Sequence, residues 1–475
     1  MTRYPPIALA YLASLLREAG HDVALMDAEG EELEIRSVAL RMKPFDPDLI
    51  VGGVNIYNPV KNFEDLIYLK KELRAPLVIR GHYPRLFPAE SIKHPDVDVV
   101  MTGKGYTSTV PLAEAIEKGG GLANIPGIYY RDGEKIKKTR EEESLMDLDA
   151  LPFPARDLFD KKLYLANLCT RRPFTTMFGS YGCVYDCWYC QEKHYPYRRR
   201  STISLVAEME QCANELGYRE ITFLDPTFTM NKAWVVDLCN RLIEKRLDLV
   251  FTIRTRADLL DEKTIRLLAG AGCVRISLGI ESGDDGVLRS MNRSIGNEEV
   301  IKIVECIRRN GIMAFGFFMV GNKGETDESL TNTHNFIKSL PLHFAQFLKM
   351  MPLPYTEVLR QSQKRLGYNV WEKIGQGIYP TEEQFNLHSH DMEVRDLKNW
   401  IRRLFFSFYF SLSRIKSIFL LKYSPRYLWR QIDTAMLVIP LILLKYIRRK
   451  KPDFLLKIYP QAPNGGPGMK NASAG

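Results

Sequence analysis

The sequence predicts an α/β protein in which two parallel-sheet units stand in tandem and a helical extension follows. Three observations predict it. Residues 1–150 alternate short apolar runs with helical segments, and residues 170–355 repeat a strand–helix rhythm six times. Residues 380–475 are instead rich in basic and aromatic side chains, without that rhythm.

The first unit is predicted to be a doubly wound sheet with helices on both faces. The pattern predicts helices over 6–20 and 62–72, and strands over 21–26, 49–51, 76–79 and 97–101. Ligands in such sheets bind beyond the carboxyl ends of the strands. The loops there carry Gly52-Gly53, Gly81-His82 and Gly103-Lys104-Gly105. Glycines after strands also serve plain turns, so alone they are weak evidence for a cofactor.

A connecting segment over 126–168 is predicted next. Residues 126–133 suggest a hairpin, 134–143 are highly charged, and prolines follow in Leu151-Pro-Phe-Pro-Ala-Arg. The predicted domains are therefore 1–125, a linker over 126–168, 169–360, 361–460, and a Gly/Pro/Asn/Ser tail over 461–475 that is typical of disorder.

Three cysteines, Cys183, Cys187 and Cys190, follow the first strand of the second unit in the spacing Cys-x-x-x-Cys-x-x-Cys. Thiolates are the ligands of iron–sulfur clusters, and a tight loop aims three of them at one cube. Three protein ligands leave the fourth iron open to another molecule. The alternative is a structural zinc site, which prefers four ligands and would need His194 as the fourth.

The remaining five of the eight cysteines are dispersed among apolar neighbours, so they are expected to be buried free thiols in a reducing compartment. Hydrophobic content of 45% and charged content of 26% are ordinary for a globular protein. Residues 7–16 are apolar but lack a basic lead, and a buried helix is expected there rather than a secretory signal.

The second unit is predicted to be a partial (β/α)6 barrel. Strands are expected over 174–178, 220–224, 249–254, 274–279, 313–320 and 344–351, with helices over 204–216, 234–245, 262–271, 298–310 and 328–340. The chemistry of such barrels lies at the carboxyl ends of the strands. Residues at those ends are the better site candidates.

The cysteine spacing, with the aromatic Tyr189 before its last cysteine, resembles that of radical S-adenosylmethionine (radical SAM) enzymes. Several further segments recur in that family in this order: Phe223-Leu-Asp225-Pro-Thr-Phe228, Arg254-Thr-Arg256-Ala-Asp258, Gly279-Ile-Glu281-Ser282-Gly283, Gly321-Asn-Lys-Gly324-Glu325-Thr326 and Met351-Pro352-Leu-Pro354-Tyr-Thr356. The resemblance implies a 4Fe-4S cluster on Cys183, Cys187 and Cys190, and reductive cleavage of S-adenosylmethionine to a 5′-deoxyadenosyl radical.

By the same resemblance Tyr189, Arg256, Glu281 and Ser282 line the S-adenosylmethionine site. Asp225 faces the cofactor or the substrate as a candidate catalytic residue. Simpler roles stay open for two of them. Glu281 could be a strand-end carboxylate paired with Arg275 or Arg289. Asp225 could cap a helix N-terminus.

The first unit resembles the cobalamin-binding domain that precedes many radical SAM domains. The resemblance lies in Pro5-Pro6-Ile-Ala-Leu-Ala-Tyr-Leu-Ala-Ser-Leu-Leu-Arg-Glu-Ala-Gly-His, Arg80-Gly81-His82-Tyr83-Pro84 and the run from Asp96 to Gly105. It implies a flavodoxin-like sheet with the corrinoid on its carboxyl edge, near Gly81, His82, Gly103 and Gly105. Histidine ligation from the protein is not expected, because the Asp-x-His-x-x-Gly signature is absent.

Three departures from that family are visible. The first strand of the family domain, which ends in Asn-Pro-Pro, is expected to be missing, because the chain starts Met1-Thr-Arg-Tyr-Pro-Pro. The family's Gly-Gly before His is Arg80-Gly81, and its Gly-Glu-Gly is Gly103-Lys104-Gly105.

The net charge of +9 belongs to the tail. From Arg395 onward there are 16 Lys and Arg against 3 Asp and Glu, so the body is near neutral and no nucleic acid is expected as a partner. The apolar run over 435–447 is too short to span a bilayer. Two interpretations stay open for the tail: a helical segment on an anionic membrane surface, and a cap that packs on the barrel and roofs the active site.

The resemblance favours a cobalamin-dependent radical SAM enzyme that C-methylates an unactivated carbon of a small-molecule or lipid substrate. A low-potential donor, flavodoxin or ferredoxin, would supply the electron. Such an enzyme is expected in the cytoplasm, with the inner face of the membrane as a second location. The alternatives are a non-methylating oxidative cyclase or rearrangement enzyme, a tRNA- or protein-modifying radical enzyme, and a membrane-associated corrinoid-sensing scaffold.

Overall fold

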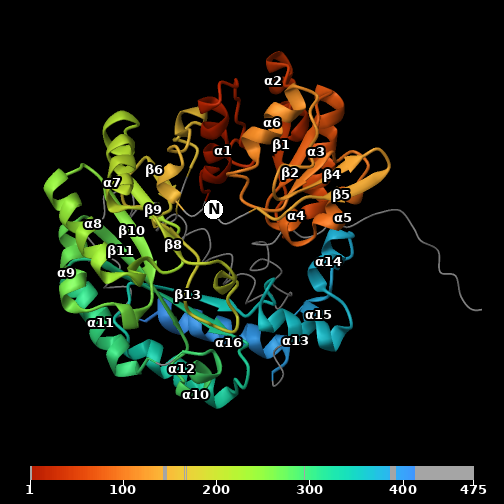
Figure 1. Cartoon of the computed structure of the whole chain (residues 1–475). Coiled ribbons are helices and arrows are strands. Elements are labelled where there is room, and N and C mark those ends of the chain that lie inside the picture. Colours follow the sequence, from red (N-terminus) through yellow and green to blue (C-terminus); the bar gives the residue numbers. More distant parts are fainter. Residues whose placement is uncertain are drawn as a thin grey trace, which may run out of the picture.

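The computed structural model describes residues 3–142, 147–164, 166, 168–293, 295–385 and 392–411. It contains two large sheets (Figure 1). The first has five strands in the order β1-β2-β3-β4-β5, and the second has six in the order β13-β12-β11-β10-β9-β6. The predicted α/β class with two sheet units is confirmed.

In the first sheet, β1 (Ile50–Gly53), β2 (Leu77–Arg80) and β3 (Val99–Met101) run parallel. Side chains of α3 (Pro59–Leu73), α4 (His82–Leu86) and α5 (Pro88–Lys93) share one apolar cluster with the sheet, and those of α6 (Thr109–Glu117) share another. Helix α6 also packs on α1 (Ile7–Glu18). Helices therefore cover both faces of the sheet, as the doubly wound prediction requires.

The predicted hairpin is present as β4 (Ile128–Asp132) and β5 (Lys135–Lys138). It pairs antiparallel with β3 and so extends the first sheet rather than lying apart from it. The loop that follows the hairpin returns across the carboxyl edge of the sheet, where Glu142 contacts the loop after β3.

The strand predicted over 21–26 is wrong: these residues are irregular. In a flavodoxin-like order of 2-1-3-4-5, the second strand pairs with the first strand alone. Before β1, which begins at Ile50, the described residues contain no strand, so this apolar segment has no ladder partner. An alternating apolar pattern forms a strand only when a neighbour takes its backbone hydrogen bonds.

All six predicted barrel strands are present and all run parallel. They are β6 (Phe174–Met177), β9 (Glu220–Phe223), β10 (Val250–Thr255), β11 (Cys273–Glu281), β12 (Met313–Val320) and β13 (Phe344–Lys349). The side chains on their outer faces join one apolar core with the surrounding helices. Polar side chains of β9, β10 and β11 alternate onto the inner face, and Phe315 and Phe317 of β12 lie on that face as well.

The outer helices also match the prediction within a few residues. They are α7 (Thr202–Glu210) with a π-helical turn (Gln211–Glu215), α8 (Lys232–Lys245), α9 (Glu262–Gly270), α11 (Asn297–Arg309) and α12 (Asp327–Ser339). A short helix that the prediction lacks, α10 (Asp285–Ser290), follows β11.

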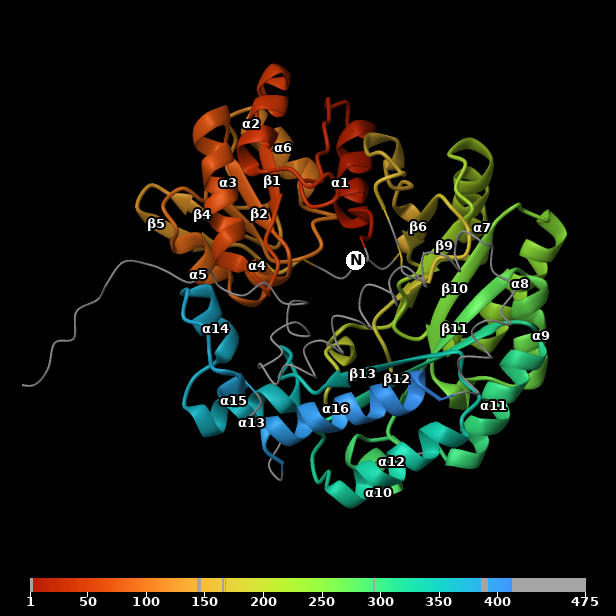
Figure 2. The ribbon, with the colours of Figure 1, turned by 180° about the vertical axis from the view of Figure 1, so that it is seen from behind.

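The C-terminal extension packs on both units (Figure 2). Helix α14 (Val370–Gly375) lies against α3 of the first unit, and Trp371 and Ile374 share an apolar cluster with Ile56. Helix α16 (Val394–Tyr409) lies on the outer face of the barrel against β13 and α12. It therefore covers the barrel from outside and does not roof the carboxyl ends of the strands. The apolar run over 435–447 lies outside the described residues. Within them no helix has the length and apolarity to cross a membrane.

Candidate active site

The three candidate cluster cysteines lie in one closed loop. The loop leaves β6 through β7 (Ser180–Tyr181) and returns through β8 (Arg198–Arg199), and these two short strands pair antiparallel. At its start Gly182 has φ +71°, and a Cβ there would lie 2.3 Å from the carbonyl oxygen of Tyr195. Only glycine fits this close approach without strain. Cys187 is buried, and Cys183 and Cys190 are half-buried.

Asp225 supports the turn that leads into this loop. Its carboxylate accepts hydrogen bonds from the Gly179 backbone N–H at 2.9 Å and from the Ser180 hydroxyl at 2.6 Å. The side chain is fully buried, and burial raises its pKa to about 6. The helix cap considered for Asp225 is provided by Asn231 instead, at the start of α8. Asp225 is placed to position the cysteine loop.

Arg256 brings positive charge to the candidate cluster ligands. Its Nη1 lies 3.9 Å from the Cys187 sulfur, and its guanidinium lies 3.8 Å from the centroid of the Tyr185 ring. Asp258 accepts hydrogen bonds from its Nε and Nη2 atoms. Arg256 is therefore held at the thiols by a carboxylate on its own loop.

Tyr189 and Glu281 meet at a second arginine. Arg293 donates to the Tyr189 hydroxyl at 3.4 Å and to the Gly279 carbonyl at 2.5 Å, and its Nη1 lies 4.0 Å from the Glu281 carboxylate. Burial raises the pKa of Glu281, while Arg293 and a hydrogen bond with Tyr189 lower it. The partner of Glu281 is thus Arg293, and neither Arg275 nor Arg289 pairs with it. Sequence reasoning missed Arg293, which follows α10 and has no motif to mark it.

Ser282 points away from this group. Its hydroxyl lies 2.9 Å from that of Thr333 on α12 and accepts from the Asp284 backbone N–H. Glu281, the last residue of β11, has φ +69° and follows a shift in the strand register, so the backbone turns between Glu281 and Ser282. Glu281 therefore faces the barrel interior, whereas Ser282 faces the helix layer.

The donor set at the loop fits a cluster better than a single ion. His194, the fourth zinc ligand considered above, is hydrogen-bonded to the Tyr355 carbonyl instead. Among the described residues, no three His, Cys, Asp or Glu side chains converge closely enough to hold one metal ion. An iron–sulfur cube binds each thiolate through a different iron, so its ligands need not meet at one point. Three thiols on one closed loop beside a guanidinium fit that group.

The candidate corrinoid residues lie on the carboxyl edge of the first sheet. Gly81 has φ +120°, and a Cβ there would lie 2.5 Å from the Val54 carbonyl oxygen. His82 is exposed at the start of α4. Glu142 accepts from the backbone N–H groups of Gly105 and Thr107, at 3.1 Å each, and leaves no room for a Cβ on Gly103. Glycine is required at Gly81 and Gly103 because Val54 and Glu142 fill the Cβ positions, and this closely packed edge, the glycine cradle, is where the resemblance places a corrinoid.

This edge touches the cysteine loop. The hydroxyls of Tyr106 and Tyr181 lie 2.9 Å apart, and the Lys104 ammonium lies 2.8 Å from the centroid of the Tyr181 ring. The Arg85 guanidinium lies 4.2 Å from the centroid of the Tyr195 ring. The predicted corrinoid edge and the predicted cluster loop therefore bound one common region.

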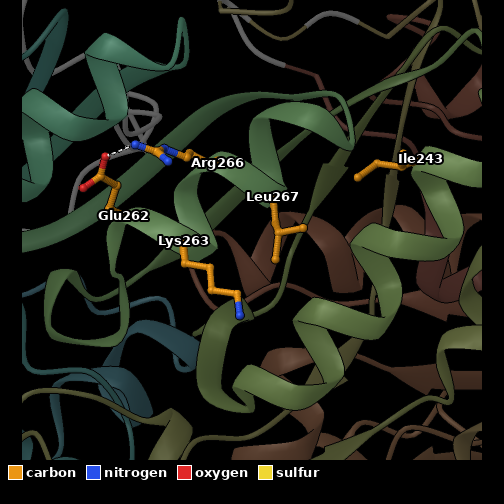
Figure 3. Close-up of a pocket in the computed structure, with 5 residues that line it drawn as sticks. All are labelled: Ile243, Glu262, Lys263, Arg266 and Leu267. Atoms are coloured by element: carbon orange, nitrogen blue, oxygen red, sulfur yellow. Dashed lines mark hydrogen bonds and ion pairs between the residues drawn. The ribbon is translucent and has the colours of Figure 1, made fainter.

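A groove between the outer helices α8 and α9 lies elsewhere (Figure 3). It is lined by Ile243, Glu262, Lys263, Arg266 and Leu267, with Glu262 and Arg266 paired. It contains none of the candidate site residues.

Comparisons with known proteins agree with this arrangement. Residues 177–337 match the family model of the radical SAM superfamily, and residues 2–112 match that of the B12 binding domain. An uncharacterized methyltransferase of Pyrococcus horikoshii is 30% identical over 363 residues, which are 75% of this chain and 78% of the relative. An anaerobic magnesium-protoporphyrin IX monomethyl ester cyclase of Rubrivivax gelatinosus is 26% identical over 371 residues, 75% of this chain and 66% of the relative.

A solved structure has the same fold. The cobalamin-dependent S-adenosylmethionine radical enzyme OxsB superposes with a TM-score of 0.67 at 16% identity, over 97% of this chain and 80% of that one. Both units and the extension are thus found together in a protein of this kind. The chain belongs to the radical SAM superfamily, in the group with an N-terminal B12 binding domain, and it is a cobalamin-dependent radical SAM enzyme whose cofactors are a 4Fe-4S cluster, S-adenosylmethionine and cobalamin.

Proposed function

We propose that this enzyme transfers a methyl group to an unactivated carbon of a small-molecule or lipid substrate. The observation that carries the proposal is the contact between the glycine edge of the first sheet and the cysteine loop, through Tyr106 and Tyr181. Methyl transfer through cobalamin needs both cofactors to face one substrate. The relative from Pyrococcus horikoshii, itself described as a methyltransferase, supports it.

In this proposal Cys183, Cys187 and Cys190 hold the cluster, and Gly81, His82, Gly103 and Gly105 border the corrinoid. When bound, these cofactors supply the one-electron chemistry and the methyl group, which the protein itself cannot. Tyr189, Arg256 and Glu281 border S-adenosylmethionine. Arg293 orients Tyr189 and Glu281, and Asp225 and Ser282 position the backbone on either side of the site.

The second candidate is a cyclase that uses the same parts without methyl transfer, which the Rubrivivax gelatinosus relative favours. The two differ in their products. Methyl transfer consumes a second S-adenosylmethionine, so S-adenosylhomocysteine accompanies 5′-deoxyadenosine, whereas cyclisation gives 5′-deoxyadenosine without it.

The test is therefore product analysis on anaerobically reconstituted protein with a low-potential donor, flavodoxin or ferredoxin, and candidate substrates. Equal amounts of S-adenosylhomocysteine and 5′-deoxyadenosine, with a mass gain of one methyl group on the substrate, are expected. Substrate turnover that yields 5′-deoxyadenosine without S-adenosylhomocysteine would contradict methyl transfer and favour the cyclase. A Cys187→Ala variant that keeps full biological activity would instead revive the scaffold alternative.

A membrane-resident substrate is favoured by the basic tail and by α16, on which Arg403, Phe405 and Phe410 are exposed. An anionic bilayer suits such a surface. The full chain is expected to sediment with vesicles of phosphatidylglycerol, and a chain ending at residue 411 is expected to sediment less. If both forms stay in the supernatant alike, this proposal fails.

A further inference from the structure

Three cations lie close to the contact between the two units. Lys104 comes from the loop after β3, Arg85 from α4, and Arg254 from β10 of the barrel. All three interact electrostatically with a single carboxylate, Glu192, which lies within the cysteine loop, just after Cys190. In the described part of the chain, no ion pair joins Glu192 to any of them.

Two other arginines at the site donate hydrogen bonds to protein oxygens, whereas the side chains of Lys104 and Arg85 contact aromatic rings. Arg256 is held by Asp258, and Arg293 by the Gly279 carbonyl and Tyr189. Lys104 and Arg85 instead rest on the rings of Tyr181 and Tyr195. Aromatic faces attract cations but do not neutralise them.

Arg254 comes from the barrel side of this region. Its neighbour Ile253 belongs to the outer apolar core, so Arg254 projects onto the inner face. Its side chain is exposed, although the strand around it is buried. In register with it lie Ser277 of β11 and, one strand further, Phe315 of β12. Because Ser277 between them is small, the exposed Arg254 and the Phe315 ring lie on the same part of the inner surface.

The charges in this region do not balance. Lys104 also interacts with Arg80 and Glu142, and the Arg80 Nε is buried without a hydrogen-bond partner. Glu142 is already bound by Gly105 and Thr107. Like charges gathered in a partly desolvated region repel one another, and either a bound anion or loss of the Lys104 proton relieves that repulsion.

We propose that Arg254, Lys104 and Arg85 bind an anionic group, phosphate or carboxylate, of the substrate that is methylated. This inference rests on the proposed function. Guanidinium groups hold such oxygens through paired charge-assisted hydrogen bonds. Phe315 and its neighbour Phe317, with ring centroids 4.9 Å apart, would contact an apolar part of the same molecule. The substrate class is therefore an anion with an apolar body.

The same anion chemistry could come from cobalamin, which carries a phosphodiester. Lys104 and Arg85 lie on the first unit, with Lys104 between Gly103 and Gly105, whereas Arg254 belongs to the barrel wall and argues for the substrate. Cobinamide is a corrinoid without that phosphodiester. Comparing its affinity with that of cobalamin therefore separates the two sources.

The experiment measures labelling of Lys104 by acetic anhydride in the cofactor-loaded full chain, with inorganic phosphate as the probe. Phosphate at about three times its dissociation constant should slow labelling about fourfold. Arg254→Gln and Arg85→Gln should raise that dissociation constant about tenfold or more, since each removes a charged hydrogen bond. Arg254→Lys should retain part of the protection.

The control is Arg36→Gln, because Arg36 is exposed on α2 (Ile35–Met42), away from the site. It should leave phosphate protection unchanged. Iron content and circular dichroism check that each variant folds.

Protection that is absent, or that survives Arg254→Gln, overturns the anion site. A loss of affinity for cobalamin but not for cobinamide in Arg254→Gln assigns the anion to the corrinoid and overturns the substrate assignment. Unchanged affinity of Arg254→Gln for both cobalamin and cobinamide supports the substrate assignment. Because these readouts need no turnover, the anion site and methyl transfer can fail separately.

Discussion

At the scale of single residues, the site is held by buried charges whose partners come from distant parts of the chain. Asp225 receives its hydrogen bonds from residues 45 and 46 positions earlier. Glu281 meets Arg293 across the turn that contains α10. Sequence motifs mark Asp225 and Glu281. Their tertiary contacts are needed to tell whether each of them touches a cofactor or positions a loop.

Asp225→Ala is expected to lower the free energy of unfolding by about 1–3 kcal/mol, because it leaves the Gly179 N–H and the Ser180 hydroxyl buried without an acceptor. The turn before Cys183 should loosen, so iron per chain should fall as well. Denaturant unfolding and iron analysis measure the two effects. Asp48→Ala, at an exposed loop position, is the control and should change neither. Unchanged iron retention would contradict the positioning role.

Lys104 makes stability depend on pH in an alkaline window. Burial lowers its pKa from 10.5 to about 7, with Arg85 and Arg80 lowering it further and Glu192 and Glu142 opposing. Between these two values the unfolded chain binds more protons than the folded chain. The free energy of unfolding contributed by this group therefore rises with pH across that window and is flat below it.

Lys104→Met is expected to remove this part of the pH dependence, because its side chain is neutral at every pH. Denaturant unfolding at several pH values from 6 to 10 compares the two proteins, and Lys43→Met, at an exposed position, is the control. An identical pH slope in wild type and Lys104→Met would show that the Lys104 pKa is ordinary.

At the scale of elements, the cysteine loop depends on one backbone conformation. Gly182→Ala places a Cβ 2.3 Å from the Tyr195 carbonyl and forces a side chain into φ +71°. The conformational part alone costs about 1–2 kcal/mol. The loop is expected to open and iron to be lost at constant protein yield. Gly296→Ala is the control, because its Cβ would meet no atom within 4 Å. Full iron content in Gly182→Ala would contradict this account.

Helix α16 belongs to the barrel and not to a separate cap. Phe408 is buried against Phe347 of β13, whereas Phe405 on the same helix is 39% exposed. Phe408→Ala is expected to lower the free energy of unfolding by about 3–5 kcal/mol, because it leaves a cavity in the outer core. Phe405→Ala should stay within about 0.5 kcal/mol. Thermal unfolding of the two variants distinguishes them, and equal losses would mean that α16 packs in another way.

At the scale of the whole molecule, the periodicity of the sequence was enough to predict the two sheets. Each barrel strand is an apolar run followed by a helix of regular period, and a parallel sheet needs little else to be recognised. Residues 21–26 show the limit, because an alternating segment needs a neighbour that no local pattern reveals. The sequence predicts a hairpin over 126–133, whereas the structure has it over 128–138 and pairs it with β3, because pairing depends on which edge of the sheet is free.

The site could be predicted in part for the same reason. Residues in one short loop, such as Cys183, Cys187 and Cys190, stay together in any fold of that loop. Arg293 and Glu142 were missed because tertiary contacts bring them to the site. The role of Ser282 beside the cofactor stays a prediction, and the left-handed backbone at Glu281 directs the Ser282 hydroxyl toward Thr333.

The two proposed cofactor positions lie on separate elements, so we expect each cofactor to be lost without the other. Cys187→Ala removes one candidate iron ligand from the barrel, and iron should fall while corrinoid stays bound. Gly81→Ala places a Cβ 2.5 Å from the Val54 carbonyl at φ +120°, so the corrinoid edge should distort while iron stays bound. Iron analysis and the corrinoid absorption spectrum of anaerobically purified protein measure both. Cys306→Ala and Gly121→Ala are the controls, a buried free thiol outside the loop and a glycine after α6 with space for a Cβ. Loss of both cofactors in either test variant would mean that the contact through Tyr106 and Tyr181 couples the two units into one cooperative site.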